Sequence, residues 1–256
     1  MSNAPQVPDT VVARFTPQRI DFTGGQYRDE TFDYQLLTPL RVEPGERYPL
    51  VLFLHGLGER GRDNRLQLMY LPEWMSRDEW RRRFPCYLLA PQCPPDGMWV
   101  EPLSPNAPIK WNRGADDRPH APAPLAMVEA ILDDACRTLP IDPSRVYLTG
   151  LSMGGYGTWL LAVRQAERFA AVAPVCGGGD VHYAARLAGA PLWAVHGADD
   201  GVVPPVRSRE MIEAIRAAGG EPRYTELAGV GHDSWTAAYS DQVGLLEWLF
   251  AQRRPS

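Results

Sequence analysis

Short apolar runs alternate with helical patterns along the chain from residue 50 onward. Residues 50–54 form a continuous apolar run, which is typical of a strand that is buried on both faces of a sheet. Similar runs recur, and apolar positions with helical spacing lie between them. This alternation predicts a mainly parallel central sheet that is flanked by helices. Further strands are expected at 86–90, 145–149, 171–175, 192–195 and 224–227, and helices at 124–137, 156–168, 205–218 and 236–252.

The opening of the chain has a different pattern. Apolar and polar positions alternate over residues 11–15 and 32–36, on either side of a glycine pair at 24–25. This predicts two antiparallel strands at the N-terminal edge of the sheet. Residues 1–10 are polar and contain proline, so we expect a flexible tail there, followed by a single domain over residues 11–256.

Residues 91–124 form a proline-rich section that includes Trp99 and Trp111. The section is too long for a simple connector, and it follows the carboxyl end of a predicted strand, where parallel sheets bind ligands. Two interpretations are open, a floppy insertion and an ordered loop that forms one wall of a site. Long loops often carry function, which favours the second, and such a wall could be fixed or could act as a mobile lid.

The composition narrows the classes of partner. The 256 residues are 45% hydrophobic, which suits one domain with a large core, and the net charge of -5 provides no basic surface for nucleic acid. The longest apolar runs are too short to cross a membrane, and residues 1–10 lack the features of a signal peptide. We therefore expect a cytoplasmic protein, a monomer or a homodimer, that binds neither nucleic acid nor membrane.

The four cysteines lack the spacing that is typical of metal sites. This favours reduced thiols, with Cys86 and Cys176 interpreted as buried apolar residues, while a bridge between Cys86 and Cys93 stays open. Because the sequence holds no cluster of candidate ligands, we expect neither a metal ion nor a cofactor.

A candidate nucleophile lies at Ser152, within the pentapeptide Gly-Leu-Ser-Met-Gly at 150–154. The pentapeptide falls between a predicted strand and a predicted helix. A serine on such a sharp strand-to-helix turn exposes its Oγ, and small residues at Gly150 and Gly154 avoid collisions across the turn. The same letters also fit a plain glycine-rich turn, so the assignment depends on the partners that the serine finds.

Partners for this serine follow in the right order. A serine hydroxyl needs a general base, usually a histidine that a carboxylate orients, and α/β-hydrolases supply them in the order Ser, Asp or Glu, His. Here Asp199 and Asp200 follow one late predicted strand, and His232 follows the next. The aspartates could instead cap the following helix, and His232 could be a turn residue. His196 is interpreted as a packed residue that braces its loop.

These motifs together resemble the α/β-hydrolase esterases of the dienelactone hydrolase, carboxylesterase and predicted-peptidase group. That group has an acid loop of the form H-G-x-x-D-x-x-V-P and a histidine loop of the form G-x-G-H-x-x-W, which match residues 196–204 and 229–235. The resemblance extends from about residue 50 to the carboxyl terminus. It implies an α/β-hydrolase fold and a catalytic triad of Ser152, Asp200 and His232, with Asp200 and not Asp199 as the acid.

The resemblance also implies an oxyanion hole. Acyl transfer builds negative charge on a carbonyl oxygen, which two backbone N–H groups stabilise. The residue after the nucleophile, Met153, should supply one of them. The loop over residues 55–61 resembles the H-G-x-G loop of carboxylesterases and acyl-protein thioesterases, which implies the Leu57 N–H as the second donor. An ordinary glycine turn is the alternative.

Aromatic residues near these motifs are candidates for the substrate pocket. An aromatic pocket suits small-acyl or aryl esters, and core packing is the alternative role for each residue. The leading hypothesis is therefore a serine carboxylesterase that acts on small-molecule esters through an acyl-enzyme. A serine peptidase or amidase, or a non-catalytic binding protein with this fold, is the alternative. The candidate pocket residues are Trp99, Trp111, Tyr156 and Trp235.

Overall fold

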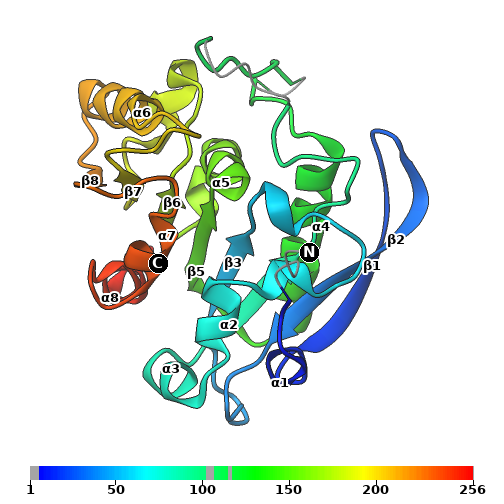
Figure 1. The fold of residues 1–256 in the computed structure, drawn as a ribbon. Helices are drawn as coiled ribbons and strands as arrows, with labels where there is room; N and C mark the ends of the chain where they lie inside the picture. The colour runs from blue at the N-terminus through cyan, green and yellow to red at the C-terminus, as the bar shows by residue number, and fades with distance from the viewer. Residues whose placement is uncertain (1–5, 102–106, 115–116, 256) are drawn as a thin grey trace, which may run out of the picture.

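The computed structural model describes residues 6–101, 107–114 and 117–255. In these residues it contains one eight-stranded sheet in the order β1-β2-β4-β3-β5-β6-β7-β8 (Figure 1). Strands β3 to β8 are parallel, while β1 and β2 pair antiparallel at one edge. The predicted α/β-hydrolase architecture is therefore confirmed. The strands are β1 Thr16–Gly24, β2 Tyr27–Leu37, β3 Tyr48–Leu54, β4 Tyr87–Pro91, β5 Ile141–Leu151, β6 Ala171–Val175, β7 Trp193–Gly197 and β8 Arg223–Leu227.

Helices cover both faces of this sheet (Figure 1). Leu50, Leu52 and Leu54 of β3 pack in the same core as α4, α5 and α6, whereas Val51 and Phe53 pack with α2 and α8. Successive side chains of a strand point to opposite faces, which is why an unbroken apolar run is buried on both sides. The α-helices are α1 Asp9–Val12, α2 Leu71–Met75, α3 Asp78–Arg83, α4 Ala123–Thr138, α5 Met153–Arg164, α6 Val206–Ala217, α7 Trp235–Tyr239 and α8 Leu245–Ala251; the 3-10 turns are η1 Leu57–Glu59, η2 Leu66–Leu68, η3 Ala166–Arg168 and η4 Val181–Leu187.

The start of the chain differs from the prediction. Val7 is only 4% exposed, its carbonyl oxygen accepts a hydrogen bond from Arg65, and helix α1 begins two residues later. Val7 is thus packed against the protein, whereas residues 6 and 8–10 are exposed and residues 1–5 lie outside the described residues, so the flexible tail over 1–10 stays a prediction. The alternating residues at 11–15 form no strand. They belong to the end of α1 and the turn that leads into β1, and Phe15 packs in the same core cluster as Val7. The expected single domain over 11–256 stays a prediction.

The carboxyl-terminal helix also differs from the prediction. The apolar pattern at 236–252 indicated one helix, but α7 and α8 are two, separated around Gly244. Helix α7 ends at Tyr239, where Ser240 turns extended with ψ 174°, and α8 begins after Gly244, whose φ of 76° is a left-handed conformation that favours glycine. Helix α5 starts three residues earlier than expected, directly after Ser152.

The described parts of the 91–124 section are anchored to the body of the protein. The Trp111 N–H donates to Asp180 Oδ2 over 2.9 Å, and Arg207 of α6 donates to the Ala107 carbonyl oxygen over 2.7 Å. These contacts support the ordered-loop interpretation for the residues they join. Among the described residues, none of the helices combines the length and apolar character that a membrane crossing requires.

Candidate active site

Ser152 occupies a sharp turn between β5 and α5. Its backbone has φ 54° and ψ -119°, a region that non-glycine residues rarely adopt and that often marks a functional site. The turn tolerates no bulk beside it: a Cβ on Gly154 would lie 1.9 Å from the Leu54 carbonyl oxygen, and one on Gly150 would lie 2.5 Å from the Gly154 carbonyl oxygen. Both glycines are therefore sterically required, as the sequence predicted.

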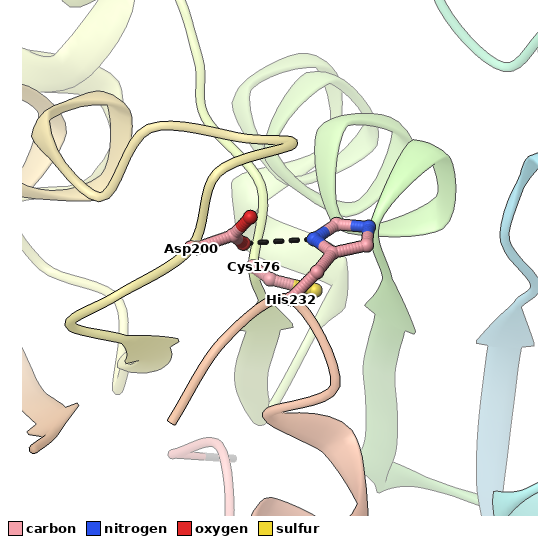
Figure 2. A group of neighbouring side chains, drawn as sticks. All are labelled: Cys176, Asp200 and His232. Atoms are coloured by element: carbon pink, nitrogen blue, oxygen red, sulfur yellow. Dashed lines mark hydrogen bonds and ion pairs between the residues drawn. The ribbon is translucent and has the colours of Figure 1, made fainter. Parts of the chain in front are cut away.

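Loops that follow three strands bring Ser152, His232 and Asp200 together. The Ser152 Oγ lies 3.0 Å from His232 Nε2, and His232 Nδ1 lies 2.8 Å from Asp200 Oδ2. Figure 2 shows the second of these contacts, with Asp200 and His232 reaching each other from separate loops. We call this row of three side chains the catalytic row, after the role that is proposed for it below. Because Asp200 can only accept at Oδ2, His232 Nδ1 donates there and Nε2 is free to take a proton from Ser152.

Asp200, and not its neighbour, contacts the histidine. Its side chain is buried, and its Oδ1 accepts hydrogen bonds from the N–H groups of Val202 and Val203, each over 2.8 Å. Asp199 is exposed to solvent. The two backbone donors fix the carboxylate of Asp200, so that Oδ2 faces His232.

The loop after β3 lies directly beside Ser152. A Cβ on Gly56 would be 3.6 Å from the Cβ of Ser152. His55 braces this loop: its Nε2 accepts from the Cys93 N–H over 2.9 Å, so its Nδ1 carries the proton and donates to the Gly56 carbonyl oxygen over 2.7 Å. Burial lowers the pKa of His55 to about 4, which keeps the ring neutral and suits this pattern.

The two expected oxyanion donors are the first residues of helical turns. Leu57 opens η1 and Met153 opens α5. N–H groups in the first turn of a helix have no partner within that helix, so both can serve a ligand. The roles of Leu57 and Met153 stay predictions.

Trp99 and Trp111 are not placed as the sequence indicated. Trp99 has 0% of its surface exposed, and its Nε1–H donates to the His55 carbonyl oxygen over 3.0 Å. This burial contradicts its predicted contact with substrate; it supports the loop after β3 from behind. Trp111 is 7% exposed and its ring stacks on Tyr183 at a centroid distance of 6.2 Å, so packing accounts for most of its surface as well.

Tyr156 and Trp235 keep part of their surface exposed near the catalytic row. The Trp235 ring stands perpendicular to the His232 imidazole, with centroids 5.3 Å apart. Tyr156 lies on α5 one turn beyond Ser152, and burial raises the pKa of its hydroxyl to about 12, so it stays protonated. Both residues remain candidates for contact with substrate.

Tyr70 is a candidate that the sequence did not reveal. Its ring lies 5.3 Å from the Trp235 ring, which in turn contacts His232. Its backbone has φ 65° and ψ -117° just before α2, a strained conformation much like that of Ser152. A single tyrosine in a segment without clear periodicity gives no signal of this kind, because the contact with Trp235 spans most of the chain.

Cys176 lies beneath the catalytic row. Its Sγ accepts a hydrogen bond from the Ser152 N–H over 3.2 Å, and one ligand atom from each of Cys176, Asp200 and His232 falls within 4.8 Å of the others (Figure 2). Metal binding needs a thiolate, but burial raises the pKa of this thiol well above its usual range. The 2.8 Å contact between His232 and Asp200 is also a hydrogen-bond distance. We therefore assign the group to hydrogen bonding. All four cysteines carry free thiols.

One concavity among the described residues lies outside this row. It has a volume of about 860 Å³ and contains none of the residues of the catalytic row. The hydrogen-bonded geometry therefore locates the candidate site, and cavity size does not. The concavity is lined by Ala166, Glu167, Phe169, Ala170, Arg186, Gly189, Ala190, Pro191, Arg253, Arg254 and Pro255.

Comparisons with known proteins agree with this fold. A thermostable esterase of known structure is 36% identical and superposes with a TM-score of 0.82 over 96% of this chain and 64% of that chain. A ferulic acid esterase from Anaeromyces mucronatus, at 15% identity and a TM-score of 0.61, covers 93% of this chain and 90% of its own and shows the same fold. The strand order, the sharp turn at Ser152 and these neighbours show that the chain has the α/β-hydrolase fold.

Residues 119–241 are similar to the dienelactone hydrolase family, and this range includes all three members of the catalytic row. Two curated relatives match over shorter stretches. A bifunctional acetylxylan esterase/xylanase from Neocallimastix patriciarum is 39% identical over 77 residues, which are 30% of this chain and 11% of that protein. A poly(3-hydroxyalkanoate) depolymerase from Paucimonas lemoignei is 41% identical over 51 residues, 20% of this chain and 12% of that protein. The chain thus matches only a small part of either relative.

Proposed function

We propose that this chain is a serine carboxylic ester hydrolase that acts on small-acyl or aryl esters. The observation that carries the proposal is the catalytic row, with 3.0 Å between Ser152 Oγ and His232 Nε2 and 2.8 Å between His232 Nδ1 and Asp200 Oδ2. These distances allow proton transfer from Ser152 to His232 and a hydrogen bond from His232 to Asp200 that stabilises the imidazolium. The dienelactone hydrolase match and the esterase relatives support hydrolytic activity.

The reaction proceeds in two steps. His232 Nε2 takes the proton of Ser152 Oγ as that oxygen attacks the ester carbonyl carbon. The tetrahedral intermediate collapses when the bond to the alcohol oxygen breaks and the imidazolium returns its proton to the leaving alcohol. A water molecule, deprotonated by the same nitrogen, then attacks the acyl-enzyme, which releases the acid and restores the serine.

Each charge that develops has a partner. The imidazolium of His232 is stabilised by the carboxylate of Asp200, which two backbone N–H groups hold in place. The oxyanion is bound by the N–H groups of Leu57 and Met153. The loop that carries Leu57 is stiffened by the hydrogen bonds of His55 and Trp99, and preorganised donors of this kind stabilise the transition state most effectively.

The alcohol of the substrate lies against an aromatic wall that we define as Tyr70 and Trp235. The two rings are 5.3 Å apart, and Trp235 contacts the base that protonates the leaving group. Planar rings favour aryl groups through offset or edge contacts. This wall therefore supports aryl esters among the small-molecule substrates. The expected cytoplasmic location and the expected monomer or homodimer remain predictions.

The proposal is tested by hydrolysis of p-nitrophenyl acetate and butyrate by the wild type and Ser152→Ala. We expect turnover by the wild type and a loss of roughly a thousandfold or more in the variant, because the nucleophile is gone. Activity that survives this substitution in a folded variant would overturn the role of Ser152.

A peptidase or amidase is the second candidate. Its support is an acylaminoacyl peptidase from Pyrococcus horikoshii that shares the fold at 16% identity, although this chain covers only 40% of that protein. A peptide p-nitroanilide assayed beside the esters separates the two functions. Turnover of the amide at a rate comparable to the ester would favour the peptidase.

A further inference from the structure

A second histidine contacts the acid of the catalytic row. His196 lies near the end of β7 and has 0% of its surface exposed. Its Nε2 is 3.2 Å from Asp200 Oδ2, the same oxygen that accepts from His232, and 2.9 Å from the Val203 carbonyl oxygen. The carboxylate of Asp200 thus lies between two imidazole rings on one oxygen and two backbone amides on the other.

The neighbours of His196 determine where its proton resides. Its Nε2 faces two oxygen atoms that can only accept, so that nitrogen carries the hydrogen. Its Nδ1 lies 2.8 Å from the Ser208 hydroxyl, whose single proton can be donated either to the Gly177 carbonyl oxygen 3.0 Å away or to Nδ1; a neutral ring that is protonated at Nε2 accepts it at Nδ1. Burial lowers the pKa of His196, which favours the neutral ring. His196 is therefore a neutral ring whose Nε2–H is hydrogen-bonded to the Val203 carbonyl oxygen and lies beside Asp200 Oδ2, with 3.2 Å between Nε2 and that oxygen.

The charged groups around this ring come from three elements besides β7. Asp200 and His232 lie in the loops after β7 and β8. On β8 itself, Glu226 is the register partner of His196, and its carboxylate is paired with Arg209 of α6. Glu226 is thus neutralised by an arginine, and Asp200 is the carboxylate that His196 Nε2 contacts, over 3.2 Å.

We propose that His196 is a positioning residue that tunes the acid of the catalytic row. Its Nε2–H fixes the orientation of the Asp200 carboxylate and withdraws part of the negative charge from Oδ2. The same oxygen must hold the Nδ1–H of His232 and stabilise the imidazolium. It must not stabilise the imidazolium so strongly that this group can no longer give its proton to the leaving alcohol. This inference rests on the proposed hydrolase function and deepens it, because it assigns a fourth side chain to the same site.

Two substitutions of His196 distinguish the loss of its hydrogen-bond donor from the loss of its packing. His196→Leu fills the site without a donor, whereas His196→Gln keeps an N–H group near the position of Nε2. In His196→Leu, Oδ2 loses one of two donors and holds the imidazolium of His232 more strongly. We expect the acid limb of the pH profile of kcat/KM to move to higher pH and kcat to fall about tenfold, with KM nearly unchanged. His196→Gln should recover most of both effects.

A third variant and a second measurement keep the inference testable if His196→Leu folds poorly. Ser208→Ala leaves the catalytic row intact and removes the partner of Nδ1, so we expect the same changes at smaller size. In the Ser152→Ala background, the proton NMR signal of the His232–Asp200 hydrogen bond should move downfield with His196→Leu and move little with His196→Gln.

The outcomes are distinct. A reduced kcat with an unmoved pH profile and an unmoved NMR signal would make His196 a packing residue and overturn the inference. The NMR measurement needs no turnover, so a wild type that hydrolyses no ester would defeat the proposed function alone. The downfield shift in His196→Leu and its recovery in His196→Gln would still support the hydrogen bond to Asp200.

Discussion

The catalytic row and the aromatic residues around it are built in different ways. Ser152, Asp200 and His232 each follow the carboxyl end of a strand within a short motif, and three loops place them within hydrogen-bond distance of one another. The aromatic wall is instead formed by a ring contact between Trp235, which ends the histidine motif, and Tyr70, which lies in no motif. Under the proposed function, the chemistry is therefore fixed by the strand ends of the sheet, while the Tyr70 segment can change without altering those motifs.

The largest expected effect concerns the acid of the catalytic row. Asp200→Asn should lower kcat about ten-thousandfold, because an amide cannot hold the Nδ1–H tautomer of His232 as a carboxylate does. Asp199→Asn is the matched control and should stay within about twofold, because its side chain is exposed. Steady-state kinetics with p-nitrophenyl butyrate measure both. A large loss with Asp199→Asn and none with Asp200→Asn would reverse the assignment.

The close packing around the sharp turn at Ser152 gives the next largest effect. A Cβ on Gly154 would lie 1.9 Å from the Leu54 carbonyl oxygen, so Gly154→Ala must move the backbone of β3 or α5. We expect a loss of about 3 kcal/mol or more in the free energy of unfolding. Gly189→Ala is the control, because a Cβ there meets nothing within 4 Å, and it should change stability by less than about 1 kcal/mol. Urea unfolding of both variants compares them, and equal stabilities would contradict the close packing.

A pH effect on stability tests the support beneath the oxyanion loop. The folded-state pKa of His55 is about 4, below its usual value of 6.5, so the unfolded chain binds more protons between these values. Stability from the neutral ring is complete above pH 6.5 and is lost as pH falls toward 4, by up to about 3 kcal/mol. Unfolding free energies of the wild type and His55→Gln at pH 4.5 and 7 measure this. The variant should depend less on pH, and identical slopes would show that His55 does not titrate in this way.

The smallest effects distinguish the buried Trp99, which supports the loop after β3, from Tyr70, which is proposed to contact the alcohol of the substrate. Trp99→Phe removes the donor to the His55 carbonyl oxygen, so kcat should fall about tenfold for every ester.

Tyr70→Ala should raise KM severalfold for p-nitrophenyl acetate and leave KM for ethyl acetate nearly unchanged, because only the first has an aryl alcohol. The two substrates share the acyl group, so the comparison isolates the alcohol side. Equal changes in KM for both esters would remove Tyr70 from the aromatic wall.

Much of the fold was accessible from local pattern. The apolar run at 50–54 and its successors predicted the parallel strands, because strands buried on both faces lack alternation. The helix predicted over 236–252 failed at Gly244, whose left-handed conformation is chosen by the tertiary structure and not by the surrounding apolar spacing. The burial of Val7 was not predicted for a related reason, since a single apolar residue becomes buried only when a partner surface exists.

The sequence by itself determined the order of the motifs and, through it, the members of the catalytic row. Strand ends are marked by short-range signals, and parallel strands bring their carboxyl ends to one edge of the sheet. The tertiary structure alone decided that Trp99 is a buried support, that Tyr70 reaches Trp235 and that His196 contacts Asp200. These contacts join residues whose distances depend on how helices and loops pack, and packing leaves no periodic trace in the order of amino acids.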